Sequence, residues 1–361
     1  MSIPPLFAEA LRTKKQFDIG LMRQLSQAVY LRFSRCRLDF WEYYFFQVYL
    51  DRYPMPEKKR FAGWRREIRL DQAANTGPAR ELANDKLLFY AHMAAHGAPQ
   101  PKIMAVYSGS ELDLPGSVHL RNEDDAVNYF RHSAHTPVFI KPLHGAHGRN
   151  AFSVGATTSD GRGLVLASGE TIGLQKFVIG LATRERGGWL LQERMNTDDR
   201  IAKFSGDRLT SVRMIILLGP SGPELVSAVW KIPTGKNVTD NFSVGRTGNL
   251  IAGIDIDTGR IARMVQGVGW KNRALTHHPD TGADLDTAGF INRRLPHWDA
   301  TKGLCLEYAA LFPGLHLQHW DIALTDRGPV ILEINVEGGM RTHQIVQQRG
   351  IVGPGLAKFG V

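Results

Sequence analysis

Two residues near the end of the chain have the chemistry of a metal site. The segment PVILEIN has the pattern of a buried strand, and it carries Glu333 and Asn335 two positions apart. Side chains two apart on a strand point to the same face of a sheet. A carboxylate and an amide oxygen side by side are hard oxygen ligands suited to Mg²⁺. Ordinary polar residues at a strand end would give the same pattern, so other residues must decide.

A second carboxylate stands upstream of this pair. Asp321 lies within the apolar segment HLQHWDIAL, which also has the pattern of a strand. It would complete a set of three oxygen donors, Asp321, Glu333 and Asn335. The sequence therefore predicts a metal site shared by the last two strands.

Lys141 is a candidate phosphate-binding residue. It ends the apolar segment VFIK and precedes a loop that contains Gly145 and Gly148. A lysine beside such a loop can bring a positive charge and backbone N–H groups to phosphates. A lysine before a surface turn is common, so this signal is weak by itself. The sequence contains no Walker motif, GxGxxG fingerprint, GxSxG elbow or HExxH helix.

The composition is that of a globular protein without disulfides. The 361 residues suffice for two or three lobes, and 43% are hydrophobic and 22% charged. The two cysteines, Cys36 and Cys305, lie far apart without His or Cys partners at metal spacing. The start lacks the basic-then-apolar order of a signal peptide, and no apolar run approaches a membrane span. These features predict a cytoplasmic protein without a zinc site.

The positive charge is concentrated at the N-terminus. The net charge is +9, and residues 1–80 hold 15 Lys and Arg against 8 Asp and Glu, which leaves +2 for the remainder. Such an excess suits an anionic partner. We expect no nucleic acid; peripheral membrane contact through residues 1–75 is one interpretation, and a solvated helical surface is the other. The aromatic stretch at 40–53 allows the same choice between a membrane anchor and the core of a small helical domain.

The order of predicted elements indicates an α+β fold. Residues 7–52 are expected to be helical, and helices are also predicted near 170–179 and 299–311. From residue 137 onward, short apolar segments with single-face alternation predict antiparallel sheets covered by a few helices.

Four sequence elements occur in an order that resembles the ATP-grasp superfamily. They are NDK at 84–86, IKP with its glycine loop, LLQERM at 190–195, and WDIAL followed by LEIN. The similarity is greatest to the sugar-transfer-associated branch, with features shared with the α-L-glutamate ligase and D-alanine–D-alanine ligase families. It covers about residues 75–350. It implies an ATP-grasp fold, in which two α+β lobes grip ATP.

The resemblance also implies a division into three parts. A helical N-terminal segment would occupy residues 1–75. The small lobe would lie within residues 76–190, and the lobe with the magnesium site would occupy residues 191–361.

The resemblance assigns roles in binding ATP and Mg²⁺. The predicted nucleotide-binding residues are Lys86 and Lys141 at the α- and β-phosphates, Gly145 and Gly148 over the phosphates, Glu193 at the adenine amino group, and Arg194 and Met195 at the ring edge. The predicted Mg²⁺ ligands are Asp321, Glu333 and Asn335. Arg213 and Lys231 would face the γ-phosphate or the acyl intermediate. Two further positions stay open: Asp198 or Asp199 for the ribose, and the family-like segment DNFSVG at 240–245, here followed by Arg246.

The resemblance implies an ATP- and Mg²⁺-dependent carboxylate–amine ligase. The reaction would pass through an acylphosphate and release ADP and phosphate, with a carboxylate substrate and an amine acceptor as partners. One alternative is a phosphotransferase on the same scaffold. Another is a nucleotide-binding accessory protein of a sugar-polymer assembly at the membrane surface.

Overall fold

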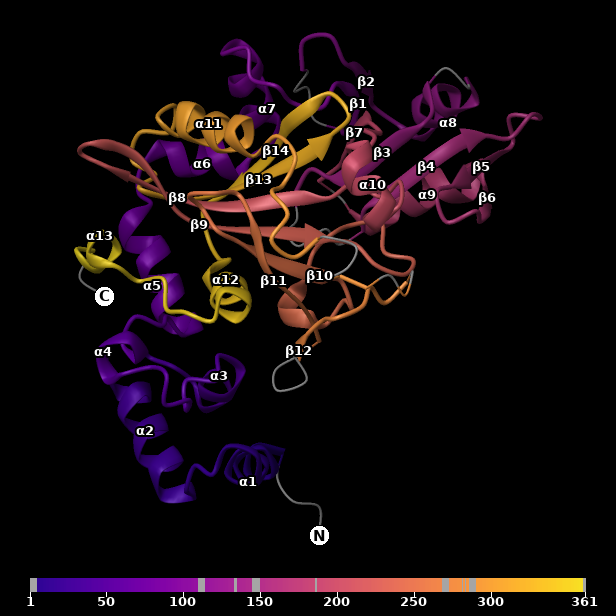
Figure 1. The fold of residues 1–361 in the computed structure, drawn as a ribbon. Helices are drawn as coiled ribbons and strands as arrows, with labels where there is room; N and C mark the ends of the chain where they lie inside the picture. Colours follow the sequence, from indigo (N-terminus) through magenta and orange to yellow (C-terminus); the bar gives the residue numbers. More distant parts are fainter. Residues whose placement is uncertain are drawn as a thin grey trace.

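Two sheets form the body of the protein. The computed structural model describes residues 5–109, 114–132, 135–144, 150–185, 187–267, 273–280, 282, 284–285 and 290–359. Figure 1 shows the two sheets side by side, with the N-terminal helices extending away from them. This arrangement is the α+β architecture that the strand and helix patterns predict.

The first sheet is built from the middle of the chain. Its strands are β1 (Ile103–Tyr107), β2 (Val118–Leu120), β3 (Val138–Pro142), β4 (Phe152–Thr157), β5 (Gly163–Leu166), β6 (Thr171–Gly173) and β7 (Trp189–Glu193), in the order β2-β1-β7-β3-β4-β5-β6. Helices α8 (Glu123–Arg131) and α9 (Leu174–Arg184) pack on it around Phe130, Phe177 and Trp189. Neighbouring strands are antiparallel except for the parallel pair β1 and β2. The helix expected near 170–179 begins later, because β6 takes its first residues.

The second sheet is longer and antiparallel throughout. Its strands are β8 (Ser211–Gly219), β9 (Gly222–Ile232), β10 (Leu250–Ile254), β11 (Ile261–Gln266), β12 (Arg273–Ala274), β13 (Leu317–Thr325) and β14 (Gly328–Asn335), in the order β12-β11-β10-β9-β8-β13-β14. One face buries Trp230 and Trp320 beneath helices. The helices associated with this core are α6 (Pro78–Asn84), α7 (Lys86–Ala95), α10 (Asp199–Ser205) and α11 (Trp298–Ala309). Figure 1 shows α6, α7 and α11 above this sheet and α12 (Met340–Gln347) below it.

The N-terminal region is a set of short helices rather than one long helical stretch. They are α1 (Pro5–Phe17), α2 (Leu21–Phe33), α3 (Phe40–Phe45), α4 (Met55–Lys58) and α5 (Trp64–Ala74). The expectation of helix across 7–52 is therefore only partly correct. Helices α1, α2 and α3 end at Phe17, Phe33 and Phe45, and the breaks that follow contain residues with positive φ angles, namely Asp18, Arg37 and Gln47.

Most of the aromatic stretch at 40–53 packs inside this region. Tyr43, Tyr44, Phe46 and Tyr49 are buried in a cluster that reaches the second sheet and α12. The core interpretation holds for these side chains, whereas Trp41 is exposed. No helix in the described part of the chain is long and apolar enough to cross a membrane.

A buried carboxyl group in this region makes stability depend on pH. Glu42 accepts hydrogen bonds from the backbone N–H groups of Asp39 (2.9 Å) and Trp64 (2.8 Å), and burial raises its pKa to about 7. The folded state then binds more protons than the unfolded state between the two pKa values, so stability is greatest below the unfolded pKa and falls as pH rises. We expect the free energy of unfolding to drop by about 2 kcal/mol between about pH 5 and about pH 7.5. Urea titrations of the wild type and of Glu42→Gln would test this, since the variant should lack that slope; an equal slope in both would refute it.

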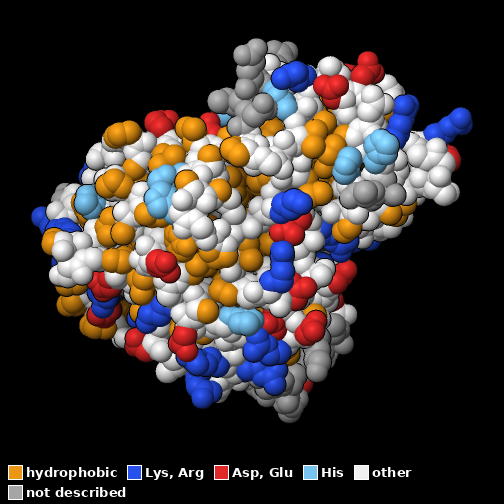
Figure 2. All heavy atoms as spheres, turned by 90° about the horizontal axis from the view of Figure 1, so that it is seen from above, with side chains coloured by type: hydrophobic (Ala, Val, Ile, Leu, Met, Phe, Trp, Pro, Cys, Tyr) orange, Lys and Arg blue, Asp and Glu red, His pale blue; other side chains and the backbone are white. Residues whose placement is uncertain are grey.

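Charges of both signs are mixed on the side of the molecule that lies opposite the N-terminal helices (Figure 1 and Figure 2). Figure 2 shows acidic and basic side chains interspersed over the face seen from above, without a large area of one sign.

Candidate nucleotide and metal site

Three neighbouring strands place Arg213, Asp321 and Glu333 in one row. Asp321 on β13 pairs in register with Arg213 on β8 and with Glu333 on β14. Residues directly opposite on adjacent strands present their side chains on the same face, close enough to interact. The sheet pairing therefore brings together residues that are up to 120 positions apart in the sequence.

Asp321 is the buried centre of this row. Its Oδ1 accepts hydrogen bonds from Arg213 Nε at 2.8 Å and lies 3.2 Å from Lys231 Nζ, while its Oδ2 accepts from Arg213 Nη2. Burial would raise the pKa of this carboxyl, but the charges of Arg213 and Lys231 outweigh it and hold the pKa well below its usual range. Burial likewise opposes the charge on Arg213, and Asp321 raises the guanidinium pKa above its usual value. The pair is therefore fully ionised.

Lys231 links this row to a second acidic residue. Lys231 Nζ lies 3.3 Å from Asp240 Oδ1, and Ser211 Oγ donates to Asp240 Oδ2 at 2.6 Å. Burial raises the pKa of Asp240, and Lys231 partly offsets this effect. Asp240 begins the DNFSVG segment that the resemblance singled out, but sequence reasoning gave it no role.

The donor set on β13 and β14 fits Mg²⁺. Glu333 Oε1 accepts from Asn335 Nδ2 at 3.1 Å, and the Glu333 side chain is 37% exposed. A carboxylate has about four lone-pair positions, and Asp321 uses three of them on Arg213 and Lys231. No group of three His, Cys, Asp or Glu side chains arranged as metal ligands occurs in the part of the chain that the structure describes. A metal here would therefore need the amide oxygen of Asn335 as its third protein donor, in agreement with the ligand preference of Mg²⁺.

Two lysines approach these carboxylates from other elements. Lys141 on β3 donates to Tyr90 Oη at 2.8 Å, and Tyr90 Oη in turn donates to the carbonyl of Leu332 on β14 at 2.6 Å. Burial lowers the Lys141 pKa, whereas the charges of Glu333 and Asp321 raise it. Tyr90 thus links the first sheet to β14, and nothing in the sequence indicated this role.

Lys86 lies beside Lys141. At the start of α7, it donates from Nζ to the Leu143 carbonyl at 3.0 Å. Burial lowers its pKa, and repulsion from Lys141 lowers it further. The two lysines therefore lie together near β14, and their role at the phosphates stays a prediction.

The three residues predicted to contact adenine lie where the chain leaves β7 of the first sheet and runs toward the second sheet. Glu193 ends β7, and its Oε1 accepts from the Lys102 N–H at 2.9 Å and from Arg327 Nη2 at 2.8 Å. Arg194 pairs with Asp207 at 3.2 Å, and Met195 is buried in a small cluster with residues of β13 and β14. Glu193 is already bound by an arginine from the turn between β13 and β14, and its adenine role stays a prediction.

The structure does not bring the remaining predicted residues together at one place. Gly145 and Gly148 lie outside the described residues. Asp198 caps α10 and contacts Arg200 and His297, whereas Asp199 is exposed in the first turn of that helix. The ribose assignment therefore stays open between the two.

Helix α5 fixes the turn that follows β14. Gly338 N–H donates to Asp71 Oδ2 at 2.8 Å, and Asp71 Oδ1 lies 3.1 Å from His319 Nε2. Met340 N–H donates to Glu67 Oε1 at 2.7 Å. Gly339 has a φ of 127°, and a Cβ there would lie 3.4 Å from Arg213 Cδ. The turn therefore packs directly against the site arginine. The only sign of this role in the sequence is the spacing of Glu67 and Asp71, four residues apart on one helix, and the sequence-based prediction did not include it.

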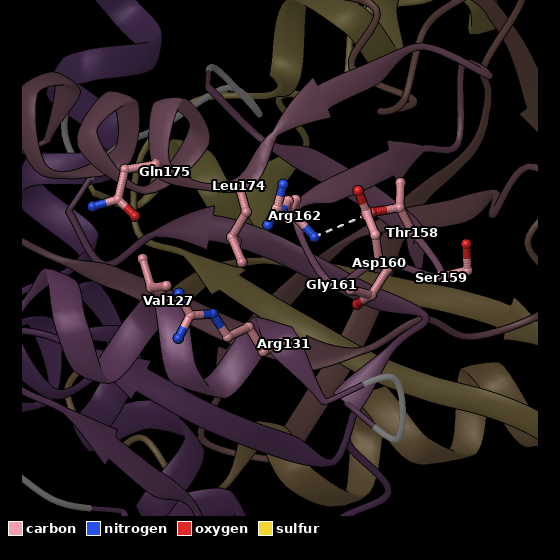
Figure 3. A pocket seen from close by; sticks show the side chains of 10 residues that line it. Val127, Arg131, Thr158, Ser159, Asp160, Gly161, Arg162, Leu174 and Gln175 are labelled. Atoms are coloured by element: carbon pink, nitrogen blue, oxygen red, sulfur yellow. Dashed lines mark hydrogen bonds between the residues drawn. The ribbon is translucent and has the colours of Figure 1, made fainter.

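An open cavity lies elsewhere on the first sheet. A volume of about 710 Å³ is bounded by α8, α9 and the turn between β4 and β5, and includes Arg131, Asp160 and Arg162. Figure 3 shows Arg131 beside Val127, and Arg162 with its backbone N–H joined to the Asp160 carboxylate. None of the predicted site residues lines this cavity, so the cavity is separate from the candidate nucleotide and metal site.

The family comparison covers most of the chain. The model of the sugar-transfer associated ATP-grasp family matches residues 65–359. This match begins ten residues before the resemblance seen in the sequence and so includes all of α5 except its first residue. No curated protein matches the chain.

Solved structures of the same superfamily are distant from this chain. The N5-carboxyaminoimidazole synthase of Aspergillus clavatus, in complex with ADP and 5-aminoimidazole ribonucleotide, is 9% identical with a TM-score of 0.41, over 78% of this chain and 54% of that one. The D-alanyl-alanine synthetase A of Vibrio cholerae is 13% identical with a TM-score of 0.42, over 76% and 62%. The L-amino acid ligase of Bacillus licheniformis is 11% identical with a TM-score of 0.37, over 78% and 49%. The chain thus spans about half to three-fifths of these structures, and likenesses at this level do not transfer their activities.

Proposed function

The chain belongs to the sugar-transfer-associated ATP-grasp family, and on that premise we propose that it is an ATP- and Mg²⁺-dependent carboxylate–amine ligase. The observation that carries the proposal is the row Arg213–Asp321–Glu333, with Lys231 beside it and Lys86 and Lys141 approaching from other elements. It combines two carboxylates, which could hold Mg²⁺, with several cations, which could face a nucleoside triphosphate.

The cations would neutralise the reacting groups. A triphosphate and a carboxylate substrate concentrate negative charge, and preorganised cations in a site shielded from water stabilise that charge strongly. Lys86 and Lys141 would bind the α- and β-phosphates. Arg213 and Lys231, held in place by Asp321 and Asp240, would face the γ-phosphate and the carboxylate.

The metal ligands would be Asp321, Glu333 and Asn335. When bound, Mg²⁺ would supply charge neutralisation of the β- and γ-phosphates. Glu333 is the more exposed carboxylate and remains accessible to a metal ion, whereas Asp321 is fixed by Arg213.

The proposed reaction has two steps. The substrate carboxylate attacks the γ-phosphorus, which forms an acylphosphate and releases ADP. The amine then attacks the acyl carbon, and phosphate leaves as the C–N bond forms and the amine loses a proton. Arg213 would stabilise the oxyanion of the tetrahedral intermediate. Both steps need positioning and charge stabilisation, and neither needs a side-chain nucleophile.

The location proposed for this reaction is the cytoplasm. Cys36 and Cys305 are both free and buried. Free thiols suit a reducing compartment, and the reaction consumes ATP.

A coupled ADP assay with hydroxylamine would test the ligase assignment. We expect ADP release to require a carboxylate, and hydroxylamine to trap the acylphosphate as a hydroxamate that mass spectrometry detects. Screening amino acids, amino sugars and sugar acids in pairs would then identify the amide product. ADP release with a phosphorylated hydroxyl compound as the end product, and no hydroxamate, would instead assign a phosphotransferase.

A further inference from the structure

Helix α2 has apolar residues on two opposite faces. Its inner face buries Ala28 and Leu31. Its outer face carries an exposed series at spacings of three, four and four residues, which we call the outer row: Met22, Leu25, Val29 and Phe33. This spacing keeps the four side chains on one side of a helix. A surface helix normally turns its second face to water with polar residues, so the outer row departs from the usual pattern.

The outer row is strongly exposed. Phe33 is 82% exposed and Met22 is 78% exposed. Single exposed apolar residues are ordinary on protein surfaces, but a continuous group indicates an interaction site. The neighbouring helices add further large apolar side chains to the exposed set, namely Phe7 and Leu11 on α1 and Phe40 and Trp41 on α3. Trp, Phe and Leu are typical of the apolar face of helices that lie in a membrane interface.

Cations stand beside these apolar side chains. Arg32 Cζ lies 5.9 Å from the ring centre of Phe33, and Lys59 Nζ lies 5.2 Å from that of Tyr30. Exposed lysines occupy the last turn of α1, and Arg35 is exposed just after α2. Among the described residues, no acidic side chain forms an ion pair with Lys14, Lys15, Arg35 or Lys59. Arg32 itself pairs with Asp39 at 3.2 Å, so in the part of the chain that the structure describes the unpaired positive charge beside the apolar side chains comes from Lys14, Lys15, Arg35 and Lys59.

We propose that the outer row docks on the surface of an anionic lipid bilayer. The apolar side chains would enter the boundary between headgroups and acyl chains, and the surrounding cations would face the lipid phosphates. Buried apolar area and attraction to anionic lipid together set the strength of such binding. Helix α2 has 13 residues, which is too short to cross the hydrocarbon core, so it lies along the surface.

A second copy of the chain is a less favourable occupant. A two-fold contact through the outer row would place the same cations of both copies close together. Like charges across an interface oppose association. Charge complementarity therefore selects an anionic surface.

The position of these helices suits docking without blocking the candidate site. Figure 1 shows α1 to α4 extending from the body of the protein, away from the first sheet and its lysine-bearing strand β3. The proposal concerns location only and does not depend on the ligase assignment.

Vesicle flotation with the full-length chain would test the proposal. Wild-type protein is expected to float with vesicles of phosphatidylglycerol and phosphatidylcholine, and much less with phosphatidylcholine alone or at high salt. The variant Leu25→Ser/Val29→Ser removes half of the outer row and should reduce the apparent affinity by about tenfold. The matched control is Ile179→Ser/Val238→Ser, which removes two apolar side chains that are about as exposed as Leu25 and Val29 but lie outside the N-terminal helices; it should bind like the wild type. The variant Lys14→Glu/Lys15→Glu should also bind anionic vesicles several-fold more weakly.

Folding and competing occupants are checked on the same proteins. Circular dichroism and thermal unfolding should be alike for all variants, and an unfolded Leu25→Ser/Val29→Ser protein would be replaced by Phe33→Ser. Absence of wild-type binding to anionic vesicles, or equal binding by the outer-row variant, would overturn the proposal. Light scattering that detects a dimer abolished by the outer-row substitutions would assign the surface to a second copy instead.

Discussion

Replacing Glu333 with Gln is expected to lower Mg²⁺-dependent ADP formation by at least about 100-fold while leaving the fold intact. The amide keeps the size of the side chain but removes the negative charge that would bind the metal. Glu333 is partly exposed, and its carboxylate lies 4.0 Å from Arg213 Nη2, which makes this contact weak. Arg213 therefore keeps its main partner, Asp321, in the variant. Loss of activity should therefore not be accompanied by loss of stability.

The measurement is steady-state ADP release over a range of Mg²⁺ concentrations. Glu337→Gln is the matched control, because Glu337 is close in sequence but pairs with Arg80 at the surface. The control should retain turnover and the same Mg²⁺ requirement. Undiminished turnover in Glu333→Gln would remove Glu333 from the metal site.

Replacing Arg213 with Met is expected to lower the free energy of unfolding by about 3 kcal/mol or more. The substitution keeps much of the apolar length of the side chain but leaves the buried carboxylate of Asp321 with Lys231 alone. An incompletely compensated buried charge is costly, which is why the effect should exceed that of an ordinary surface ion pair. Activity should also fall, because the group proposed to stabilise the oxyanion is absent.

Urea unfolding of Arg208→Met provides the control for this effect. Arg208 and Arg213 have similarly exposed side chains, at 25% and 21%, but the partner of Arg208 is the more exposed Asp280. We expect the control to lose no more than about 1 kcal/mol. Equal losses in the two variants would show that burial of Asp321 has no special energetic consequence.

The strand patterns in the sequence were sufficient to predict the site row only in part. Alternation identified the strands that carry Arg213, Asp321 and Glu333, and the pairing of β13 with β14 follows from their adjacency in the chain. The placement of β8 on the other side of β13 could not be derived from alternation, because pairing between strands distant in sequence depends on the whole sheet. The ion pair between Arg213 and Asp321 became apparent only from the register.

The supporting residues were less predictable for a related reason. Tyr90 and Asp71 reach the site from helices whose local sequence shows ordinary amphipathic patterns. Their roles depend on hydrogen bonds to Leu332 and Gly338, which no local motif encodes. Helix boundaries also shifted where single residues take positive φ angles, as Asp18 does between α1 and α2.

The contacts of α5 have a consequence for the stage of synthesis at which this part of the protein can fold. Asp71 and Gly338 are separated by 267 residues, and Glu67 and Met340 by 273. Contacts between such distant segments incur the entropic cost of closing a very large loop before they form. During synthesis, α5 leaves the ribosome long before the turn after β14 exists, so its two carboxylates remain without these partners until nearly all of the chain has been translated. The contacts between α5 and this turn are therefore completed late, and a chain terminated before Gly338 cannot form them.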